Sequence, residues 1–363
     1  MIRCSRKELL NALQTLSGIL PSKSPKPILE NVLFHPLKNT VEVLATDLEV
    51  GIKLTLTEVE VIQKMDFLVP GQKLLGILKE SEADTVAFEM QENHCKITLN
   101  QDIFNVLSLS PEEFPQIADF QEKETFSIPS TLLRNMIRKT SFATANEATR
   151  YTMNGLLMDN DGKTMKTVAT DGKRLAYTQC KSPTKEKFSV LLPPKGFQHI
   201  EKVLSHHRNE NASLLIKENQ LLLKANSTIL TVQLLQGNFP PYQNVIPKGF
   251  PLSTSIHKNA FTKSLKKALL LTIQESQSVR LHFEEKTLTL FSHDPSIGEA
   301  TVFANLEEPI AEPLDISFNP TFFLDVLKVL EEDIVHLSFK DSTSPGVIQE
   351  KDDFLYVVMP LNL

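Results

Sequence analysis

The chain has 363 residues, of which 41% are hydrophobic and 23% charged, as is ordinary for a soluble globular protein. Its net charge of −6 argues by itself against nucleic acid as a partner, so any such interaction must depend on where the charges lie. We find neither an apolar run long enough for a membrane helix nor a secretory signal after the N-terminus, and we expect no membrane partner. Cys4, Cys95 and Cys180 are widely spaced, which favours a reducing cytoplasm over a disulfide scaffold or a metal site, and no cofactor is expected.

Residues 1–122 predict one folding unit with two helices. Ser5 and Glu8 form a capping-box pattern, and apolar Leu9, Ala12, Leu13 and Leu16 follow at helical spacing. Proline 70 favours the start of a second helix over residues 72–79. Alternating apolar runs predict strands at 2–4, 29–34, 41–45, 50–56, 85–88, 96–99 and 104–109.

Residues 123–250 and 251–363 repeat this order. In the second unit a helix follows Pro129, the dipeptide Asp171-Gly172 predicts a β-hairpin, and Pro194 enters another helix that runs to residue 204. In the third unit a first helix that includes Lys258 and Phe261 is predicted, a second helix spans residues 321–330, and a strand at 355–359 ends the chain. The predicted core faces of the two leading helices are Leu132, Leu133, Met136 and Ile137, and Phe261, Leu265, Ala268 and Leu269.

The aspartates at positions 47, 171 and 294 lie 124 and 123 residues apart, which indicates that one folding unit is repeated three times along the chain. We interpret these three aspartates as structural turn residues. Each unit is predicted to be α+β, with two helices packed on antiparallel sheets. The predicted domains are residues 1–122, 123–250 and 251–363.

The first helix of each unit carries cations away from its apolar face, in a chain that is acidic overall. Surface helices often carry lysine, so any single helix is ambiguous. The same bias at the equivalent place in three repeats favours a shared helical face that meets phosphates without reading bases. The cations are Arg6 and Lys7, then Arg134, Arg138 and Lys139, then Lys258, Lys263, Lys266 and Lys267, with weaker second helices that carry Lys73, Lys79, Lys195 and Lys202.

Four blocks of the sequence, residues 150–155, 169–176, 237–242 and 356–361, resemble the bacterial DNA sliding clamp, the β subunit of DNA polymerase III. The resemblance covers the whole chain in order. It implies three DNA-clamp domains per chain and a head-to-tail homodimer, in which each chain forms half of a closed ring around duplex DNA. It further implies a non-catalytic processivity subunit that slides without sequence specificity and binds the polymerase III catalytic subunit, the clamp loader, repair polymerases and mismatch-repair proteins.

The resemblance also implies a surface pocket that receives short partner peptides. Apolar anchors in such a pocket supply most of the affinity. For Val357 a role as a plain core strand residue is an equal alternative. Three rim positions depart from the family pattern, Thr152, Asn244 and Asn362, so the preference for partner peptides is open. The implied pocket consists of Met153, Thr170, Gly172, Lys173, Arg174, Leu175, Pro240, Val245, Val357, Met359, Pro360 and Leu361.

By the same resemblance, two more surfaces are expected. The ring interface joins the first domain of one chain to the third of the next, through Phe104 and Val106 and through Leu269 and Leu270. Glu147 stands at a position that touches DNA in relatives, where its charge is unfavourable. The DNA-facing residues are Arg6, Lys7, Lys23, Lys73, Arg134, Arg138, Lys139, Tyr151, Lys195, Lys263, Lys266 and Lys267.

The rival hypothesis is a repeat-built hydrolase with its site in a cleft between domains. It needs a convergent acid and base, and the spacing of the residues supports no such set. His206-His207 has no partner at ligand spacing, so surface histidines are the favoured interpretation over a metal site.

Overall fold

The computed structural model describes residues 1–146, 152–273 and 277–361. They form two compact units, Met1–Arg134 with Leu192–Leu234, and Asn135–Leu191 with Leu235–Leu363. The described residues contain six α-helices, two for each predicted repeat. The strand pairs whose register the structure describes are antiparallel, and the strands form four sheets, which agrees with the predicted α+β class.

The first repeat begins as predicted. Ser5 caps α1, since its side-chain oxygen accepts from the Glu8 amide at 3.3 Å. The Glu8 carboxylate does not complete the capping box but accepts from the amides of Thr57 and Glu58 at 2.8 and 2.9 Å. The elements are β1 (Ile2–Ser5), α1 (Arg6–Leu16), β2 (Asn31–Pro36), β3 (Val41–Thr46), β4 (Val50–Leu56), β5 (Val59–Val61), β6 (Phe67–Pro70), α2 (Gly71–Glu80), β7 (Thr85–Gln91), β8 (His94–Leu99) and β9 (Asp102–Leu107).

The second repeat contains one wrong prediction about a helix face. On α3 the side chain of Leu132 is exposed, whereas Lys139 is buried beside Leu133, Met136 and Ile137 on the core side. The elements are β10 (Phe126–Pro129), α3 (Ser130–Ser141), β11 (Leu156–Asn160), β12 (Thr164–Thr170), β13 (Arg174–Lys181), β14 (Phe188–Leu192), α4 (Pro194–His206), β15 (Asn211–Lys217), β16 (Gln220–Ala225) and β17 (Thr228–Gln233).

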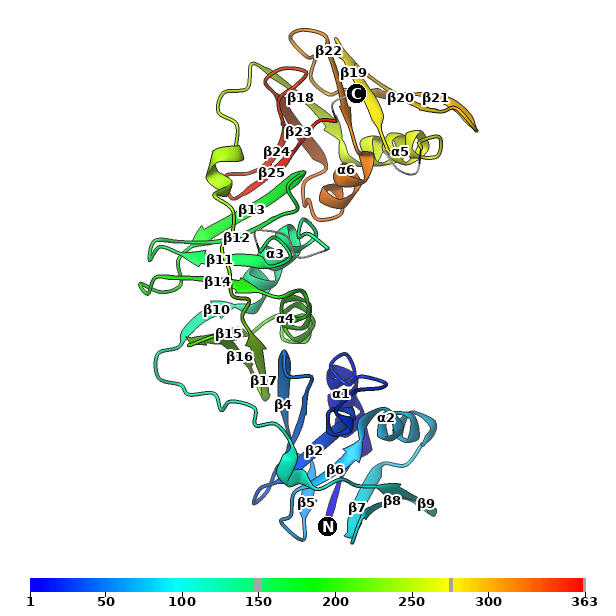
Figure 1. The fold of residues 1–363 in the computed structure, drawn as a ribbon, viewed down its shortest axis with the longest axis vertical. Coiled ribbons are helices and arrows are strands. Elements are labelled where there is room, and N and C mark those ends of the chain that lie inside the picture. The colour runs from blue at the N-terminus through cyan, green and yellow to red at the C-terminus, as the bar shows by residue number, and fades with distance from the viewer. Residues whose placement is uncertain (147–151, 274–276, 362–363) are drawn as a thin grey trace. The chain divides into compact units, whose positions relative to one another are not determined.

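In the third repeat the two helices pack against each other (Figure 1). The ring of Phe261 is edge-on to that of Phe323. The last helix ends at Leu327, three residues before the predicted end. The elements are β18 (Leu252–His257), α5 (Lys258–Leu269), β19 (Val279–Glu284), β20 (Thr287–Asp294), β21 (Gly298–Asn305), β22 (Leu314–Phe318), α6 (Pro320–Leu327), β23 (Ile334–Phe339), β24 (Gly346–Glu350) and β25 (Phe354–Val358).

Neighbouring repeats share their largest sheets. One eight-stranded sheet has the order β10-β15-β16-β17-β4-β3-β2-β6, and another has the order β18-β23-β24-β25-β13-β12-β11-β14. Strand by strand these orders correspond, so β4 pairs with β17 in the first sheet as β13 pairs with β25 in the second. A five-stranded sheet ends at β9 and a four-stranded sheet ends at β21.

The three repeated aspartates organise turns, as predicted. Oδ1 of Asp47 accepts from the amides of Glu49 and Val50, and Oδ1 of Asp171 accepts from those of Lys173 and Arg174, all between 2.8 and 3.0 Å. Asp294 accepts from the amide of Ser296 at 2.8 Å. A short polar side chain that bonds the backbone two residues onward stabilises such a turn. In the described residues no helix has the length and apolar character to cross a membrane.

Candidate functional site

The predicted peptide pocket lies on the face of the second eight-stranded sheet. Leu175 of β13 stands directly opposite Val357 of β25, and both belong to one apolar cluster. Side chains that are opposite each other in antiparallel strands lie on the same face of the sheet. The buried members of the cluster are Leu157, Val168, Leu175, Leu191, Tyr242, Val347 and Val357.

The hairpin turn from Thr170 to Arg174 is rigidly held at one end of this cluster. Thr170 donates its hydroxyl to the Arg174 carbonyl at 2.6 Å and accepts from the Gly172 amide at 3.1 Å. Gly172 has φ +85°, a conformation that glycine adopts without steric cost. The Met359 amide donates to the Lys173 carbonyl at 2.8 Å, which brings the C-terminal segment alongside the turn.

The predicted pocket residues differ widely in exposure. Thr170, Leu175 and Val357 are buried, so Val357 is both a core strand residue and part of the floor of this cluster. Val245 and Met359 are apolar side chains that remain 50% and 41% exposed at its border. Gly172 and Lys173 are exposed, and the half-buried members are Met153, Arg174, Pro240, Pro360 and Leu361.

Arg174 differs from its predicted place in the pocket lining. Its guanidinium is 2.8 Å from Asp325, 3.0 Å from Asp171 and 2.9 Å from the Phe142 carbonyl. It also lies 4.6 Å from the centre of the Phe322 ring. Since Arg174 precedes Leu175 in the strand, its side chain leaves the opposite face of the sheet. The side chain therefore anchors α6 and the turn rather than presenting a free charge to a ligand.

The predicted pocket omits five buried members of the cluster, Leu157, Val168, Leu191, Tyr242 and Val347. Tyr242 follows Pro240 and Pro241 in a block that carried the resemblance, which is the one signal that could have identified it. Burial raises the pKa of Tyr177, which lies beside Tyr242, to about 12, and nearby Tyr242, Asp161 and Asp159 add to this shift. A cavity of about 340 Å³ borders the cluster and is lined by Leu157, Asp159, Ser189, Leu191 and residues 237–243.

Most of the predicted DNA-facing lysines are free on the surface. On α5 the side chains of Lys263, Lys266 and Lys267 are exposed. Lys7 of α1, Lys73 of α2, and Lys23, which lies between α1 and β2, are exposed as well. Lys195 of α4 is 57% exposed but is held 2.9 Å from Asp47 and 3.7 Å from Glu49. The hydrogen bond that Lys195 donates to the Asp47 carboxylate is the main reason why the pKa of Lys195 is raised. Tyr151 and Glu147 lie outside the described residues.

Lys139 was wrongly predicted to face DNA. Its ammonium is buried 2.8 Å from the carboxylate of Glu350 and lies over the Phe354 ring. A buried charge needs such a partner, because the free energy of removing it from water is otherwise uncompensated. The side chain therefore fastens α3 to β24 and cannot contact phosphates.

Three arginines are less available than predicted. Arg6 donates to the carbonyls of Ala83 and Leu78 at 2.7 and 2.8 Å and so closes the end of α2. Arg134 is half-buried with Glu201 3.4 Å away. Arg138 is half-buried, and its Nε has no hydrogen-bond partner among the described residues. The free cations are thus mainly lysines on α1, α2 and α5.

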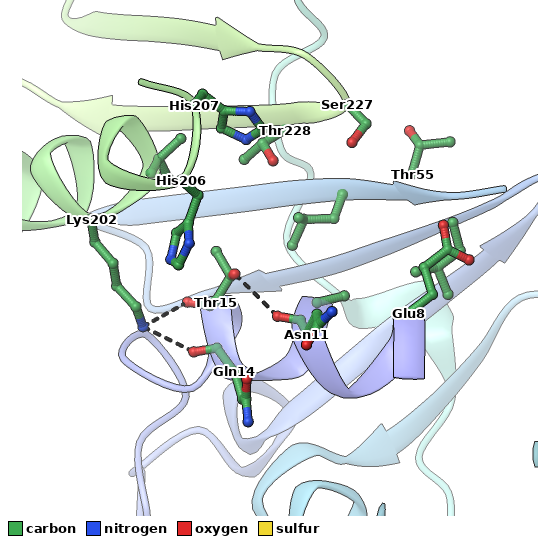
Figure 2. Close-up of a pocket in the computed structure, with 14 residues that line it drawn as sticks. Glu8, Asn11, Gln14, Thr15, Thr55, Lys202, His206, His207, Ser227 and Thr228 are labelled. Carbon is green, nitrogen blue, oxygen red and sulfur yellow. Dashed lines mark hydrogen bonds between the residues drawn. The ribbon is translucent and has the colours of Figure 1, made fainter. Parts of the chain in front are cut away.

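A seam between α1 and α4 holds the two helices in one unit. Figure 2 shows Lys202 of α4 reaching the carbonyls of Gln14 and Thr15 at the end of α1, with distances of 2.9 and 3.3 Å. A cation at a helix C-terminus bonds carbonyls that lack partners within the helix. Beside this contact lies a cavity of about 530 Å³ that is lined by Glu8, His206, His207 and eleven other residues.

The predicted interface side chains lie on the edge strand β9 and at the end of α5. β9 ends its sheet and exposes Phe104, with Val106 half-buried, and the flanking Ile103 and Leu107 are exposed as well. Leu270 after α5 is 77% exposed, and Leu269 is half-buried. β21 ends another sheet and exposes Phe303. The sequence reasoning missed Ile103, Leu107 and Phe303, although exposed apolar residues on an edge strand indicate pairing with another chain.

The surroundings of the cysteines and histidines do not indicate a catalytic or metal-binding role. Burial raises the pKa of the Cys4 and Cys95 thiols to about 12, the charge of Glu8 adding to the shift at Cys4, so neither is an activated nucleophile. His207 lies 3.3 Å from Glu210, three residues further along the chain. Among the residues that the structure describes, no group of three or more His, Cys, Asp or Glu side chains is arranged to hold a metal ion.

Three family models together match almost the whole chain. They are the N-terminal, central and C-terminal domains of the DNA polymerase III beta subunit, which match residues 1–118, 127–241 and 243–362. A beta sliding clamp of Chlamydia pneumoniae is 31% identical over 99% of this chain and 98% of its own length. The sliding clamp of Pseudomonas aeruginosa bound to griselimycin superposes with a TM-score of 0.94 at 27% identity, over 99% of both chains. A DNA polymerase III beta subunit from Thermotoga maritima gives 0.91 at 29% identity over the full length of both chains.

Three tandem repeats of two helices on antiparallel sheets define a protein of the DNA-clamp class. The relatives that match 99% of the chain narrow this class to the bacterial beta sliding clamps. The chain belongs to the DNA polymerase III beta subunit family, the bacterial beta sliding clamps.

A beta sliding clamp is a non-catalytic processivity factor for DNA polymerase III, and this is the role of the chain. As a homodimeric ring the clamp encircles duplex DNA, slides along it and tethers the polymerase. The prediction of a non-enzymatic clamp is therefore confirmed over the rival hydrolase.

Proposed function

We propose that the apolar cluster of β13 and β25 is the docking groove for partner peptides, which come from the polymerase III catalytic subunit, the clamp loader, repair polymerases and mismatch-repair proteins. The observation that carries the proposal is the pair of exposed apolar side chains at its border, Val245 and Met359. A surface-exposed apolar rim beside a buried apolar floor suits short peptides with large apolar anchors. The altered rim residues Thr152 and Asn244 set which peptides bind best.

The groove can be tested with the double variant Val245→Asp/Met359→Asp. The probe is a fluorescently labelled peptide from the clamp-binding segment of a bacterial polymerase III catalytic subunit. We expect at least about a tenfold loss of affinity, since two carboxylates would be desolvated where apolar anchors pack. The control is Leu37→Asp, a similarly exposed apolar residue in the other compact unit. Equal affinity of both variants for the peptide would reject the groove.

We assign contact with duplex DNA to the exposed lysines Lys7, Lys23, Lys73, Lys263, Lys266 and Lys267, with Lys195, Arg134 and Arg138 as secondary candidates. The six lysines are supported by their exposure. Lys7, Lys263, Lys266 and Lys267 are supported also by their recurrence on the leading helices of the first and third repeats. Few and mobile cations suit a protein that slides, because each phosphate contact adds affinity without sequence information.

Ring closure is assigned to β9 of one chain and the β21 and α5 region of the next. Support comes from exposed Phe104, Leu107, Leu270 and Phe303 on or near two sheet edges. A heterologous contact between two such edges closes a dimer when both junctions form. The domain boundaries after residues 122 and 250 belong to the same proposal.

The cytoplasm is the proposed compartment. Cys4, Cys95 and Cys180 are free thiols, and a reducing environment keeps them so.

A further inference from the structure

The first eight-stranded sheet contains a second copy of the peptide groove. Leu33, Leu44 and Gly51 stand 124 residues before Leu157, Val168 and Leu175 of the second sheet. Gly51 pairs with Thr231 of β17 in the register in which Leu175 pairs with Val357 of β25. We call the sheet face at Leu33, Leu44, Gly51 and Thr231 the first groove, and the face at Leu157, Val168, Leu175 and Val357 the second groove.

The first groove is covered by the chain itself. Phe114 and Ile117, which follow β9, pack with Leu33 and Leu44 in one apolar cluster. A Cβ atom added to Gly51 would lie 3.2 to 3.3 Å from three carbons of the Ile117 side chain. Ile117 therefore stands on the backbone at the place where Leu175 supplies its own side chain in the second groove.

Two ion pairs hold this segment across the sheet. Lys53 of β4, itself buried, is 2.6 Å from Asp119, and Lys224 of β16 is 2.8 Å from Glu122. Lys224 also lies over the ring of Phe120. We call residues 114–122 the strap.

At the second groove the corresponding segment, 125 residues onward, also packs on the sheet, through Phe239 and buried Tyr242 at the positions of Phe114 and Ile117. It lacks the residues that form the two ion pairs. The positions of Lys53 and Asp119 are Tyr177 and Asn244 there, 124 and 125 residues onward. The positions of Lys224 and Glu122 are Gln349 and Pro247, each 125 residues onward, so neither ion pair can form. Val245, at the position of Phe120, is 50% exposed instead of lying beneath a lysine.

Thr231 provides an independent sign that the first groove is sealed. It occupies the position of Val357 and is buried, and its hydroxyl has no hydrogen-bond partner among the described residues. An unpaired buried hydroxyl costs free energy that an open, hydrated groove would not impose.

We propose that the strap is a resident occupant of a latent peptide groove, so that each chain offers one docking groove for partner peptides although the fold builds two. This inference rests on the proposed function of the second groove. The latent groove takes the same chemical class of ligand, short peptides with large apolar side chains, once the strap is released.

The test variant is Gly51→Leu/Ile117→Ala/Asp119→Asn/Glu122→Gln. It gives the sheet the leucine that the second groove has at Leu175, removes most of the Ile117 side chain that lies over this position, and removes both ion pairs. The labelled polymerase peptide described above is titrated against the full-length protein, and the number of peptides bound per chain is measured. We expect one for the wild type and two for the variant.

Deleting residues 359–363 separates this inference from the proposed function. With that deletion alone the protein is expected to bind no peptide, and with the four strap substitutions added it is expected to bind one. If the wild type binds none, the proposed function of the second groove fails. If the wild type binds one and the folded strap variant also binds one, only the strap proposal is overturned.

A milder variant guards against loss of folding. Asp119→Asn/Glu122→Gln removes the ion pairs and leaves Gly51 and Ile117 in place, and the control Glu112→Gln/Glu113→Gln makes the same charge change at exposed residues without an ion pair in the described structure. Amide hydrogen exchange over residues 114–122 should quicken in the first variant only. When residues 359–363 are also deleted from the Asp119→Asn/Glu122→Gln variant, saturating peptide should slow amide hydrogen exchange in β4. An unchanged exchange rate in β4 would overturn the proposal.

Discussion

The turns that follow Asp47 and Asp171 have the same hydrogen bonds but different residues at the position after the aspartate. Leu48 and Gly172 occupy the same turn position, 124 residues apart, with φ angles of +78° and +85°. A residue with a Cβ atom is strained in this left-handed conformation by roughly 1–2 kcal/mol. Leu48 is 51% exposed, so little apolar burial offsets that strain.

We therefore expect Leu48→Gly to raise the free energy of unfolding by up to about 1 kcal/mol, the strain relieved being partly offset by the greater entropy of glycine in the unfolded chain. Gly172→Ala should lower it by about 1 kcal/mol, since open space surrounds the added Cβ and only the backbone conformation matters. Urea unfolding of both variants measures these shifts. Leu48→Ala is the control, because it shortens the side chain and retains the strain. A Leu48→Gly variant less stable than Leu48→Ala would contradict the argument.

At the scale of elements, one buried ion pair joins α3 to β24. Glu350 accepts from Lys139 at 2.8 Å and from the amides of Glu331 and Glu332 at 2.6 and 2.9 Å. Lys139→Met should lower the free energy of unfolding by about 3 kcal/mol, because it leaves a buried carboxylate without its cation. The double variant Lys139→Met/Glu350→Gln retains an acceptor for both amides and should be more stable than Lys139→Met alone. Thermal unfolding of the wild type and the two variants tests this. Equal losses of stability in both variants would mean that the two charges do not interact.

The same pair predicts how stability depends on pH. Burial alone would raise the pKa of Glu350, but Lys139 and the two amides outweigh it and hold the pKa below the ordinary value of 4.5. A carboxyl group with a lowered folded-state pKa stabilises the fold fully above the unfolded value and loses that contribution as the pH falls through the folded value. Below about pH 4.5 the wild type should therefore lose stability more steeply than Lys139→Met/Glu350→Gln. Parallel unfolding curves for the two proteins from pH 6 to pH 3 would refute this.

Elements formed from local patterns were predictable, and those that depend on distant partners were not. The buried face of α1, Leu9, Ala12, Leu13 and Leu16, agrees with the predicted one, because its periodicity is written in consecutive turns. The face of α3 was misplaced by the burial of Lys139, whose partner Glu350 is 211 residues away. Likewise the strands of the groove were predictable, but the contribution of Tyr242 and the commitment of Arg174 to Asp325 depend on tertiary contacts.

For the whole molecule, we expect the exposed lysines of α5 to contribute to the affinity for DNA. Lys263→Glu/Lys266→Glu should lower the slope of log affinity against log salt by about 2, since each lost phosphate contact removes about 0.9 from it. The control Lys185→Glu/Lys187→Glu makes the same charge change at exposed lysines between β13 and β14. Fluorescence anisotropy with a labelled duplex over a range of salt measures both slopes. If the α5 variant and the control give the same slope, these lysines do not face DNA.

Encirclement predicts retention that depends on the topology of the DNA rather than on its sequence. After loading by a bacterial clamp loader, the protein should stay on nicked circular DNA through gel filtration and leave once the circle is linearised. Ile103→Asp/Leu107→Asp places two carboxylates on the exposed edge strand β9 and should yield monomers by light scattering, because a charged edge opposes pairing with another chain. Such monomers should be lost from circular and linear DNA alike, since an open half-ring has no topological link. Retention of the wild type on linear DNA, or of the monomeric variant on circles, would show that direct contacts and not ring closure hold the clamp in place.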